Sequence, residues 1–345
     1  MKKIIVLVVL LVIGAIAFVF GWPMYQLHFT KIKLNQDKLI YVHTGTSLNE
    51  LATQVEEEEI CSSTDFLKFS GDLDFDDSKI EAGKYQVTGS MKIKNLIYAL
   101  KNGNQEIKDV KITFNNCKSI QDLAGKVAPN IECDSTELVS YIMSSVVMEK
   151  YGFNEQTIPA LFLPDTYEVG EWDMSAEEFV AFMAEQWKDF WNAERQAKMK
   201  DLNLTESKVS TLASIIEAEQ GIHTEEWTTI AGLYLNRVKK GMKLEADPTA
   251  KFCWGDELNG VQRILNVHLQ KDCPYNTYLY SGIPPGPIRI PSKKAIDAIL
   301  NAEKHNYIFF CARADNSGLH AFAETYNQHL ENARKFWKYM DSRGH

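Results

Sequence analysis

Leu39-Ile40-Tyr41-Val42, followed after a short gap by Ser47-Leu48-Asn49-Glu50-Leu51-Ala52, is the stretch that indicates the fold class. The first four residues are typical of a strand. Ser47 stands three residues before Glu50 and just ahead of apolar residues, so the two side chains can form a reciprocal capping box at a helix N-terminus. The stretch therefore predicts a small strand–turn–helix unit.

The same unit recurs downstream. Residues 110–114 alternate like a strand and lead to Ser119, which stands three residues before Asp122. A looser copy runs from Tyr85-Gln86-Val87 into an apolar helical pattern that stops at Gly103. These units carry no obvious reactive group, so we expect them to pack or to bind.

Most of the remaining chain has helical spacing. Helices are predicted over most of 136–200, and two more over 207–240. Residues 245–292 are rich in proline and are predicted to be mainly loop, while 307–311 is typical of a buried strand and 327–339 of a closing helix. The second helix of 207–240 has an apolar face of Ile230, Leu233, Tyr234 and Val238. Strand–helix units beside longer helical regions predict an α+β fold.

The N-terminus has the pattern of a membrane anchor. Lys2 and Lys3 precede an uncharged stretch over 4–22, close to the ~20 residues that cross a bilayer as a helix. The positive charges favour a cytoplasmic N-terminus, which would place the rest of the chain outside the cytoplasm. Ala15-Ile16-Ala17 resembles a cleavage site, so a cleaved signal peptide is the alternative.

Composition excludes some functions and leaves the cysteines open. A net charge of -9 over 345 residues gives no basic surface for nucleic acid. None of the six cysteines forms CxxC, which argues against a zinc ribbon or a thioredoxin motif. Disulfides between Cys253 and Cys273 and between Cys117 and Cys133 are hypotheses, with buried thiols as the alternative.

The chemistry of the chain centres on Leu212-Ala213-Ser214-Ile215-Ile216-Glu217-Ala218-Glu219-Gln220. Phosphate loops, HExxH and GxSxG are all absent, so neither a cofactor nor a metal is predicted. Carboxylates at the end of an apolar helix are costly to bury unless they cap a helix or pair with a cation. Desolvation would also raise the pKa of a carboxyl toward neutrality, as a general acid requires.

The two glutamates of this stretch are predicted to differ in role. At about 100° per residue they diverge by about 160°, and Glu219 extends the apolar side of the helix. We therefore predict Glu219 as the general acid, because the more apolar surroundings keep a carboxyl protonated. Glu217 is predicted to orient the site, to pair with a cation, or to serve the helix end.

The polar, aromatic and Pro/Gly-rich region beyond this helix could build a cleft for sugar hydroxyls and ring faces. Each of its residues taken alone is more often an ordinary loop or core residue, so the prediction depends on the group as a whole. The candidate supporting or substrate-binding residues are Asn236, Asp247, Tyr275, Asn276 and Tyr278, with Gly286 close by.

These residues resemble the YceG-like family of endolytic murein transglycosylases. The resemblance extends over most of the chain, although Ala218 and Gln220 depart from the usual family pattern. The motifs that carry it are Ala213-Ser214-Ile215-Ile216-Glu217-Ala218-Glu219, Leu235-Asn236-Arg237, Asp247-Pro248-Thr249, Tyr275-Asn276-Thr277-Tyr278 and Gly282-Ile283-Pro284-Pro285-Gly286-Pro287-Ile288.

The resemblance implies a metal-free, non-hydrolytic cut of MurNAc-(β1→4)-GlcNAc bonds in nascent glycan strands, leaving 1,6-anhydroMurNAc ends. It implies an enzyme that ends strand elongation at the cytoplasmic membrane, beside peptidoglycan synthases, with its catalytic domain outside the cytoplasm. The corresponding organisation is an anchor over 1–22, a LysM-like subdomain within 38–104, a linking strand and helical region over 105–200, and a catalytic domain over 201–345.

Two other functions compete with this one. A peptidoglycan-binding scaffold without activity is compatible with the LysM-like segment. A lysozyme-like hydrolase would use water and leave reducing ends.

Overall fold

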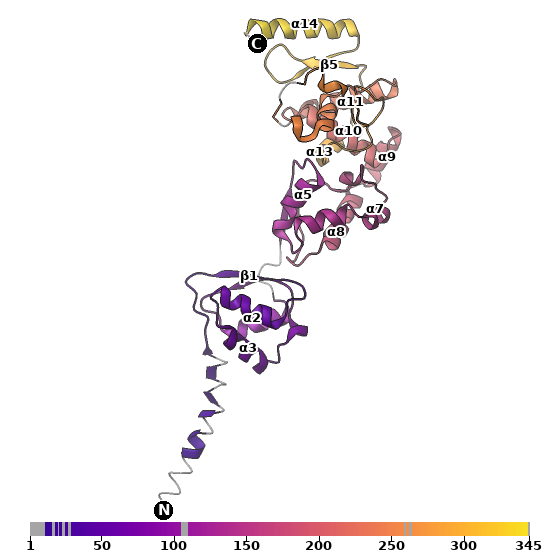
Figure 1. Ribbon diagram of the computed structural model, residues 1–345. Helices are drawn as coiled ribbons and strands as arrows, with labels where there is room; N and C mark the ends of the chain where they lie inside the picture. The colour runs from indigo at the N-terminus through magenta and orange to yellow at the C-terminus, as the bar shows by residue number, and fades with distance from the viewer. Residues whose placement is uncertain are drawn as a thin grey trace, which may run out of the picture. The chain divides into compact units, whose positions relative to one another are not determined.

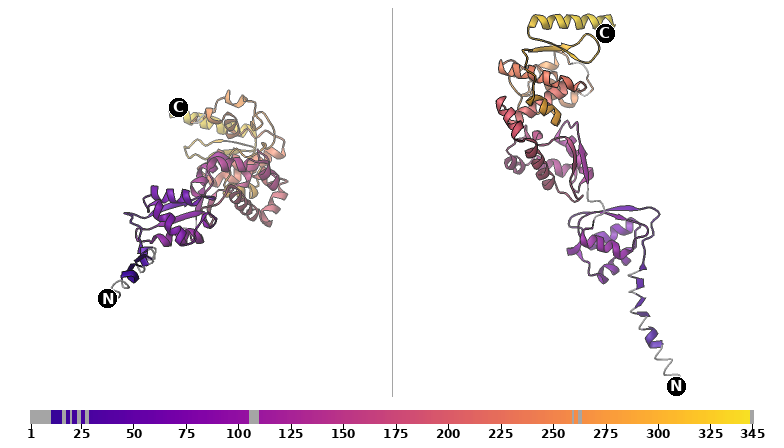
Figure 2. Two further views of the ribbon diagram at one scale, coloured as in Figure 1. Left: turned by 60° about the horizontal axis from the view of Figure 1, so that its bottom comes forward. Right: turned by 180° about the vertical axis from the view of Figure 1, so that it is seen from behind.

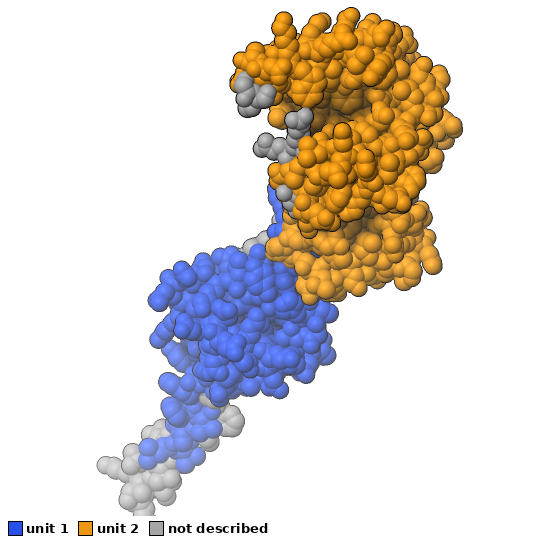
Figure 3. Space-filling view, turned by 45° about the horizontal axis from the view of Figure 1, so that its top comes forward, with its two compact units in different colours: residues 1–111, 130–133, 168–175 blue, residues 112–129, 134–167, 176–345 orange. Residues whose placement is uncertain are grey.

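The computed structural model describes residues 11–15, 18–19, 21–22, 25–26, 29–104, 110–258, 260–261 and 264–343. The chain divides into two compact units (Figure 3). The first unit comprises residues 1–111, 130–133 and 168–175, and the second comprises 112–129, 134–167 and 176–345. Helices and small two-stranded sheets together make a mixed α+β fold, as predicted.

The secondary structure is mainly helical. The strands are β1 (Lys38–Val42), β2 (Gly83–Val87), β3 (Lys111–Phe114), β4 (Asp165–Glu168), β5 (Phe309–Ala312) and β6 (His320–Ala323). The α-helices are α2 (Leu48–Glu57), α3 (Ser63–Asp72), α4 (Ile93–Asn102), α5 (Ile120–Val127), α6 (Ser135–Ile142), α7 (Ser145–Tyr151), α8 (Ala176–Phe190), α9 (Ala193–Asp201), α10 (Glu206–Glu219), α11 (Trp227–Lys239), α12 (Asp247–Trp254), α13 (Lys293–Leu300) and α14 (Tyr326–Ser342). The short 3₁₀ helices are η1 (Asp77–Lys79), η2 (Ala128–Asn130), η3 (Ile158–Leu161), η4 (Thr224–Glu226), η5 (Gly255–Leu258) and η6 (His268–Gln270).

The first unit is an antiparallel pair of strands packed against helices. β1 pairs with β2 in a register that sets Ile40 opposite Tyr85. Alternate residues of both strands, including Ile40, Val42 and Val87, are buried against α2, α3 and α4. Figure 1 shows α2 and α3 on one side of β1. The other face of the ribbon carries half-buried and exposed residues, as expected when only one face of a sheet is packed.

The helix-start signals predicted from the sequence are present. The Ser47 N–H donates to Glu50 Oε2 at 2.8 Å, and the Glu50 N–H donates to Ser47 Oγ at 3.3 Å, which completes the capping box. Ser119 caps α5 by accepting the Asp122 N–H at 3.1 Å, while the Asp122 carboxylate accepts the Lys118 N–H at 2.9 Å. α4 ends at Gly103, whose φ of 61° lies in the left-handed region that glycine adopts without strain.

The second unit is built around α10. Every residue of this helix from Val209 to Ile216 is buried, and the helix packs against α11 and α13. Over this stretch the helix is therefore buried on all sides, and not only on the apolar side that Glu219 was predicted to extend. Thr211 and Ser214 are buried as well, and their hydroxyls donate to carbonyl oxygens one turn back in the helix, each at 2.7 Å.

Two elements differ from the sequence-based expectation. The region 245–292 was predicted to be mainly loop, but it contains the helix α12. Pro248 is compatible with this helix because it lies in the first turn, where proline costs no hydrogen bond. The strand predicted over 307–311 is β5, which is half-buried rather than buried and pairs antiparallel with β6. Figures 1 and 2 show α14 beside this ribbon, against which it packs.

The cysteines divide into one bridge and several thiols. Cys253 and Cys273 form a disulfide with a Cα–Cα distance of 6.0 Å. The thiol side chains are those of Cys61, Cys117, Cys133 and Cys311. The second predicted bridge, Cys117 to Cys133, is therefore wrong, and the buried-thiol alternative holds for that pair.

Most of the predicted anchor, 4–22, lies outside the described residues. Within the part of the chain that the structure describes, no helix combines the length and the apolar character needed to cross a bilayer.

Candidate active site

Glu219 is the last residue of α10, at the point where the buried helix reaches the edge of the core. The Tyr234 hydroxyl donates to Glu219 Oε1 at 2.9 Å. Burial, helped by the charge of Asp247, raises the pKa of the Glu219 carboxyl to about 8, against the opposing effects of the Tyr234 hydrogen bond and Arg237. The carboxyl is therefore protonated at neutral pH.

Tyr234 lies on α11 and is fully buried. Burial and the neighbouring Glu219 hold the pKa of this phenol well above its usual range, so the hydroxyl keeps the proton that it donates to Glu219. Tyr234 was predicted only as part of an apolar helix face, and this hydrogen-bonding role was not predicted. The signal was available, because a buried tyrosine hydroxyl nearly always requires a polar partner.

Asp247 and Tyr278 complete the group around Glu219. The Tyr278 hydroxyl donates to Asp247 Oδ1 at 2.6 Å. Burial, this hydrogen bond and the charges of Asp247 and Glu219 raise the pKa of Tyr278. Asp247 begins α12 and is exposed, whereas Glu219 is partly buried. The structure thus brings the predicted residues Glu219, Asp247 and Tyr278 together with Tyr234, and we refer to these four as the Glu219 cluster.

Arg237 supports this cluster from α11. Its side chain is only 6% exposed, and it donates to the Leu244 carbonyl at 2.9 Å and to Glu245 Oε2 at 3.0 Å. It also donates to the Ile308 carbonyl at 2.7 Å. Arg237 therefore fixes the segment that leads into Asp247. It belongs to the motif at 235–237, but it was not predicted as a site residue.

Glu217 points to a different part of the molecule. Its Oε2 accepts the Ser292 N–H at 2.9 Å, and Ser292 is the N-cap of α13. A carboxylate at this position also interacts favourably with the helix dipole. The divergence of the two glutamates is as predicted, and the helix-end role is the one that the Glu217 contact fits.

Asn236 and Asn276 hold backbone segments and do not join the Glu219 cluster. The Asn236 amide donates to the carbonyls of His305 and Tyr307 at 2.8 and 3.1 Å. Asn276 is fully buried; its amide donates to two loop carbonyls, and its Oδ1 accepts the Tyr278 N–H at 3.0 Å. Asn276 thereby positions the residue that binds Asp247.

Tyr275 also lies apart from the cluster. Its ring packs against Phe252 with the centroids 4.7 Å apart, and both rings line a separate hollow. Gly286, in the proline-rich segment, is buried.

A buried polar network fixes the turn that follows Glu219. The Gln220 amide donates to Glu226 Oε2 at 3.0 Å, and the same carboxylate accepts the His320 N–H at 2.9 Å. Gln220 Oε1 also accepts the N–H groups of Ile222 and His223. This network joins the end of α10 and the nearby η4 to β6, which is distant in sequence, so no local pattern predicts the contact with β6.

The chain is similar in sequence to a known family and to several known proteins. A sequence model of the YceG-like family matches residues 40–335. A Bacillus subtilis (strain 168) protein named endolytic murein transglycosylase is 24% identical over 315 residues, covering 86% of this chain and 84% of that protein. A Streptococcus pneumoniae (serotype 2, strain D39) protein of the same name is 23% identical over 328 residues, covering 85% of this chain and 58% of that protein.

The fold is shared with a solved structure. A yceG-like protein from Listeria monocytogenes matches with a TM-score of 0.54 at 21% identity, covering 86% of this chain and 99% of that one. Because the family match spans most of the sequence and this structure has the same fold, the chain belongs to the YceG-like family.

Proposed function

We propose that this chain is an endolytic murein transglycosylase, a lytic transglycosylase that cuts peptidoglycan glycan strands. The observation that carries the proposal is the Glu219 carboxyl, whose pKa burial raises to about 8 and which accepts a hydrogen bond from Tyr234. A protonated carboxyl at neutral pH is what a general acid in glycoside cleavage requires. The names of the B. subtilis and S. pneumoniae relatives support the same activity.

The proposed reaction uses one carboxyl twice. Glu219 donates its proton to the glycosidic oxygen as the bond from C1 of MurNAc to that oxygen breaks. The resulting Glu219 carboxylate then takes the proton of the MurNAc C6 hydroxyl while the oxygen of that hydroxyl bonds to C1. This step leaves a 1,6-anhydro end and restores the acid. No water is consumed. Asp247 supports the first step, since its charge helps to keep Glu219 protonated.

The products decide between this function and its two competitors. The purified protein is incubated with nascent glycan strands, and the new ends are identified by mass spectrometry. Ends lighter by one water than reducing ends are expected. Reducing ends would instead identify a hydrolase, and strands that sediment with the protein but remain uncut would identify a scaffold.

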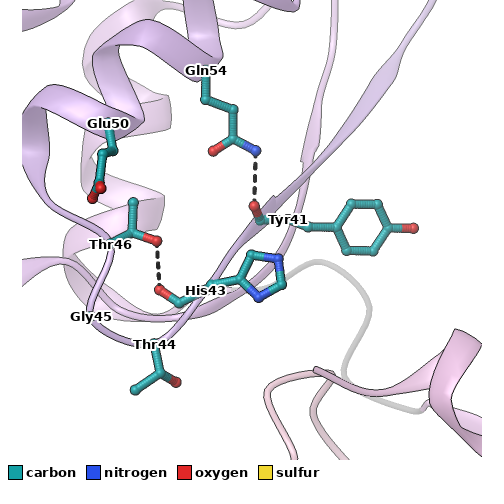
Figure 4. Close-up of a pocket in the computed structure, with 7 residues that line it drawn as sticks. All are labelled: Tyr41, His43, Thr44, Gly45, Thr46, Glu50 and Gln54. Atoms are coloured by element: carbon teal, nitrogen blue, oxygen red, sulfur yellow. Dashed lines mark hydrogen bonds between the residues drawn. The ribbon is translucent and has the colours of Figure 1, made fainter. Parts of the chain in front are cut away.

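The proposal extends to the first unit, where residues 38–104 would form a LysM-like, glycan-associated subdomain linked by 105–200 to a catalytic domain over 201–345. A shallow hollow of about 500 Å³ lies between the end of β1 and α2 (Figure 4). Its polar lining of hydroxyl, amide and carboxylate groups suits sugar hydroxyls. The lining residues are Tyr41, His43, Thr44, Gly45, Thr46, Glu50 and Gln54.

We further propose an extracytoplasmic location, with residues 1–22 as a single-pass anchor in the cytoplasmic membrane and peptidoglycan synthases as neighbours. The disulfide between Cys253 and Cys273 supports an oxidising compartment. An alkaline carbonate wash is expected to leave the protein in the membrane fraction. Release into the soluble fraction would contradict the anchor.

A further inference from the structure

A second hollow, of about 180 Å³, lies within the second unit. It is separate from the Glu219 cluster, and its lining combines basic, aromatic and polar side chains. The residues that bear on its chemistry are Lys118, Glu155, Gln156, Phe252, Tyr275 and Arg289.

Arg289 is the distinctive group of this lining. Its guanidinium donates to Asn116 Oδ1 through one terminal nitrogen. Its Nε is buried and has no hydrogen-bond partner among the described residues. A ligand cannot reach the buried Nε from the hollow, so the donors available to an acceptor there are those of the terminal guanidinium nitrogens. They lie in the planar fork that suits a carboxylate.

The charge of the lining sets the kind of acceptor. Lys118 and Arg289 contribute two positive charges, and Glu155 contributes one negative charge. The net charge of these three side chains is one positive charge, which matches a single carboxylate better than a doubly charged phosphate. Arginine is also the side chain best suited to binding a carboxylate.

The aromatic wall of the hollow lies close to the Glu219 cluster. Phe252 follows Asp247 by five residues on α12, about 7.5 Å along the helix axis. Tyr275 precedes Tyr278 by three residues, and the disulfide between Cys253 and Cys273 ties the two segments together. A substituent of a sugar bound at Glu219 could therefore reach this hollow.

The geometry points to this hollow as a binding site for a carboxylate carried by the muramyl residue of the substrate, with Arg289 as its main partner. This inference rests on the proposed function. Two carboxylates share this chemistry: the one on the lactyl group of a bare strand, and those of a stem peptide on an intact strand. Phe252 and Tyr275 would pack against the apolar part of either substituent.

The test compares Arg289→Gln with wild type on three substrates: intact strands, strands stripped of stem peptides, and strands whose carboxylates have been amidated. Loss of one charge-assisted hydrogen bond is expected to raise KM about 10- to 100-fold on a carboxylate-bearing substrate, with kcat nearly unchanged. On amidated strands the variant and wild type should be equal. A loss confined to intact strands assigns the stem peptide, and a loss confined to stripped strands assigns the lactyl group.

Arg313→Gln is the matched control, because Arg313 is exposed, pairs with Asp315 and does not line the hollow. An equal loss on amidated and unmodified strands would overturn the inference. Strand binding measured by sedimentation in a Glu219→Gln background gives a second readout that needs no turnover. It keeps failure at the hollow distinct from failure of the proposed function, which would show as absent 1,6-anhydro ends with the wild-type protein.

Discussion

Replacing Glu219 by glutamine is expected to lower the rate of glycan cleavage at least about 10²-fold, the usual scale of general acid–base catalysis. Glutamine keeps an oxygen that can accept the Tyr234 hydroxyl, so the site geometry is retained while the transferable proton is lost. The measurement is single-turnover cleavage of strands, with strand binding measured in parallel. The binding should change little.

The pH dependence of glycan cleavage by wild type is a second test of Glu219 as the general acid. Because burial raises the Glu219 pKa to about 8, cleavage by wild type should persist through neutrality and then fall about tenfold per pH unit above pH 8. An ordinary carboxyl would lose its proton near pH 4. The raised pKa also means that folding favours the protonated form, so this group's contribution to stability declines as pH rises from its unfolded pKa to about 8. Glu219→Gln should therefore gain in relative Tm over that range.

Glu217→Gln is the matched control for this experiment. It lies on the same helix and undergoes the same chemical change, but its carboxylate accepts the Ser292 N–H at the start of α13. Losing that charge should cost about 0.3–1 kcal/mol in the free energy of unfolding and much less in cleavage rate. A properly folded Glu219→Gln protein with near-normal cleavage would refute the assignment, and a larger loss at Glu217 would reverse it.

Gly286→Ala is expected to produce the largest loss of stability from a single methyl group. A Cβ at this position would overlap the Gln156 carbonyl oxygen and lie 2.6 Å from the carbonyl carbon. The obstacle is backbone, and Pro285 and Pro287 restrict the other side, so neither segment can yield easily. We expect a loss of about 3 kcal/mol in the free energy of unfolding, equivalent to roughly 6–12 °C in Tm.

Gly125→Ala provides the opposite expectation. Gly125 lies inside α5, and outside its own stretch of helix no atom of the described residues lies within 4 Å of an added Cβ. Alanine should therefore raise stability by about 0.5–1 kcal/mol through helix propensity. Calorimetry on both variants tests the pair. Equal Tm values for Gly286→Ala and wild type would show that the two backbones do not approach so closely in solution.

Local features of the fold were predictable because local physics determines them. The capping box of Ser47 and Glu50 and the helix stop at Gly103 depend on neighbours within a few residues. The opposite directions of Glu217 and Glu219 follow from helix geometry alone. Burial of Glu219 was likewise predicted from the apolar helix that precedes it.

The rest of the candidate site depends on tertiary packing. Tyr234 has the spacing of a core residue, and only the approach of α10 to α11 turns its hydroxyl toward Glu219. Asn236 and Asn276 have the type of side chain that binds sugars. In the fold, however, their amides donate hydrogen bonds to backbone carbonyls. A sequence pattern identifies the side chain but does not identify the partner.

The network that joins Gln220, Glu226 and His320 sets the order in which the molecule can be completed. Synthesis proceeds from the N-terminus, so the helix that ends at Glu219 leaves the ribosome about 100 residues before β6. Until His320 arrives, the Glu226 carboxylate lacks the N–H that it accepts in the finished fold. A chain cut short anywhere before that strand therefore carries the acid without its finished surroundings, so the glutamate reaches its final setting only in a nearly complete polypeptide.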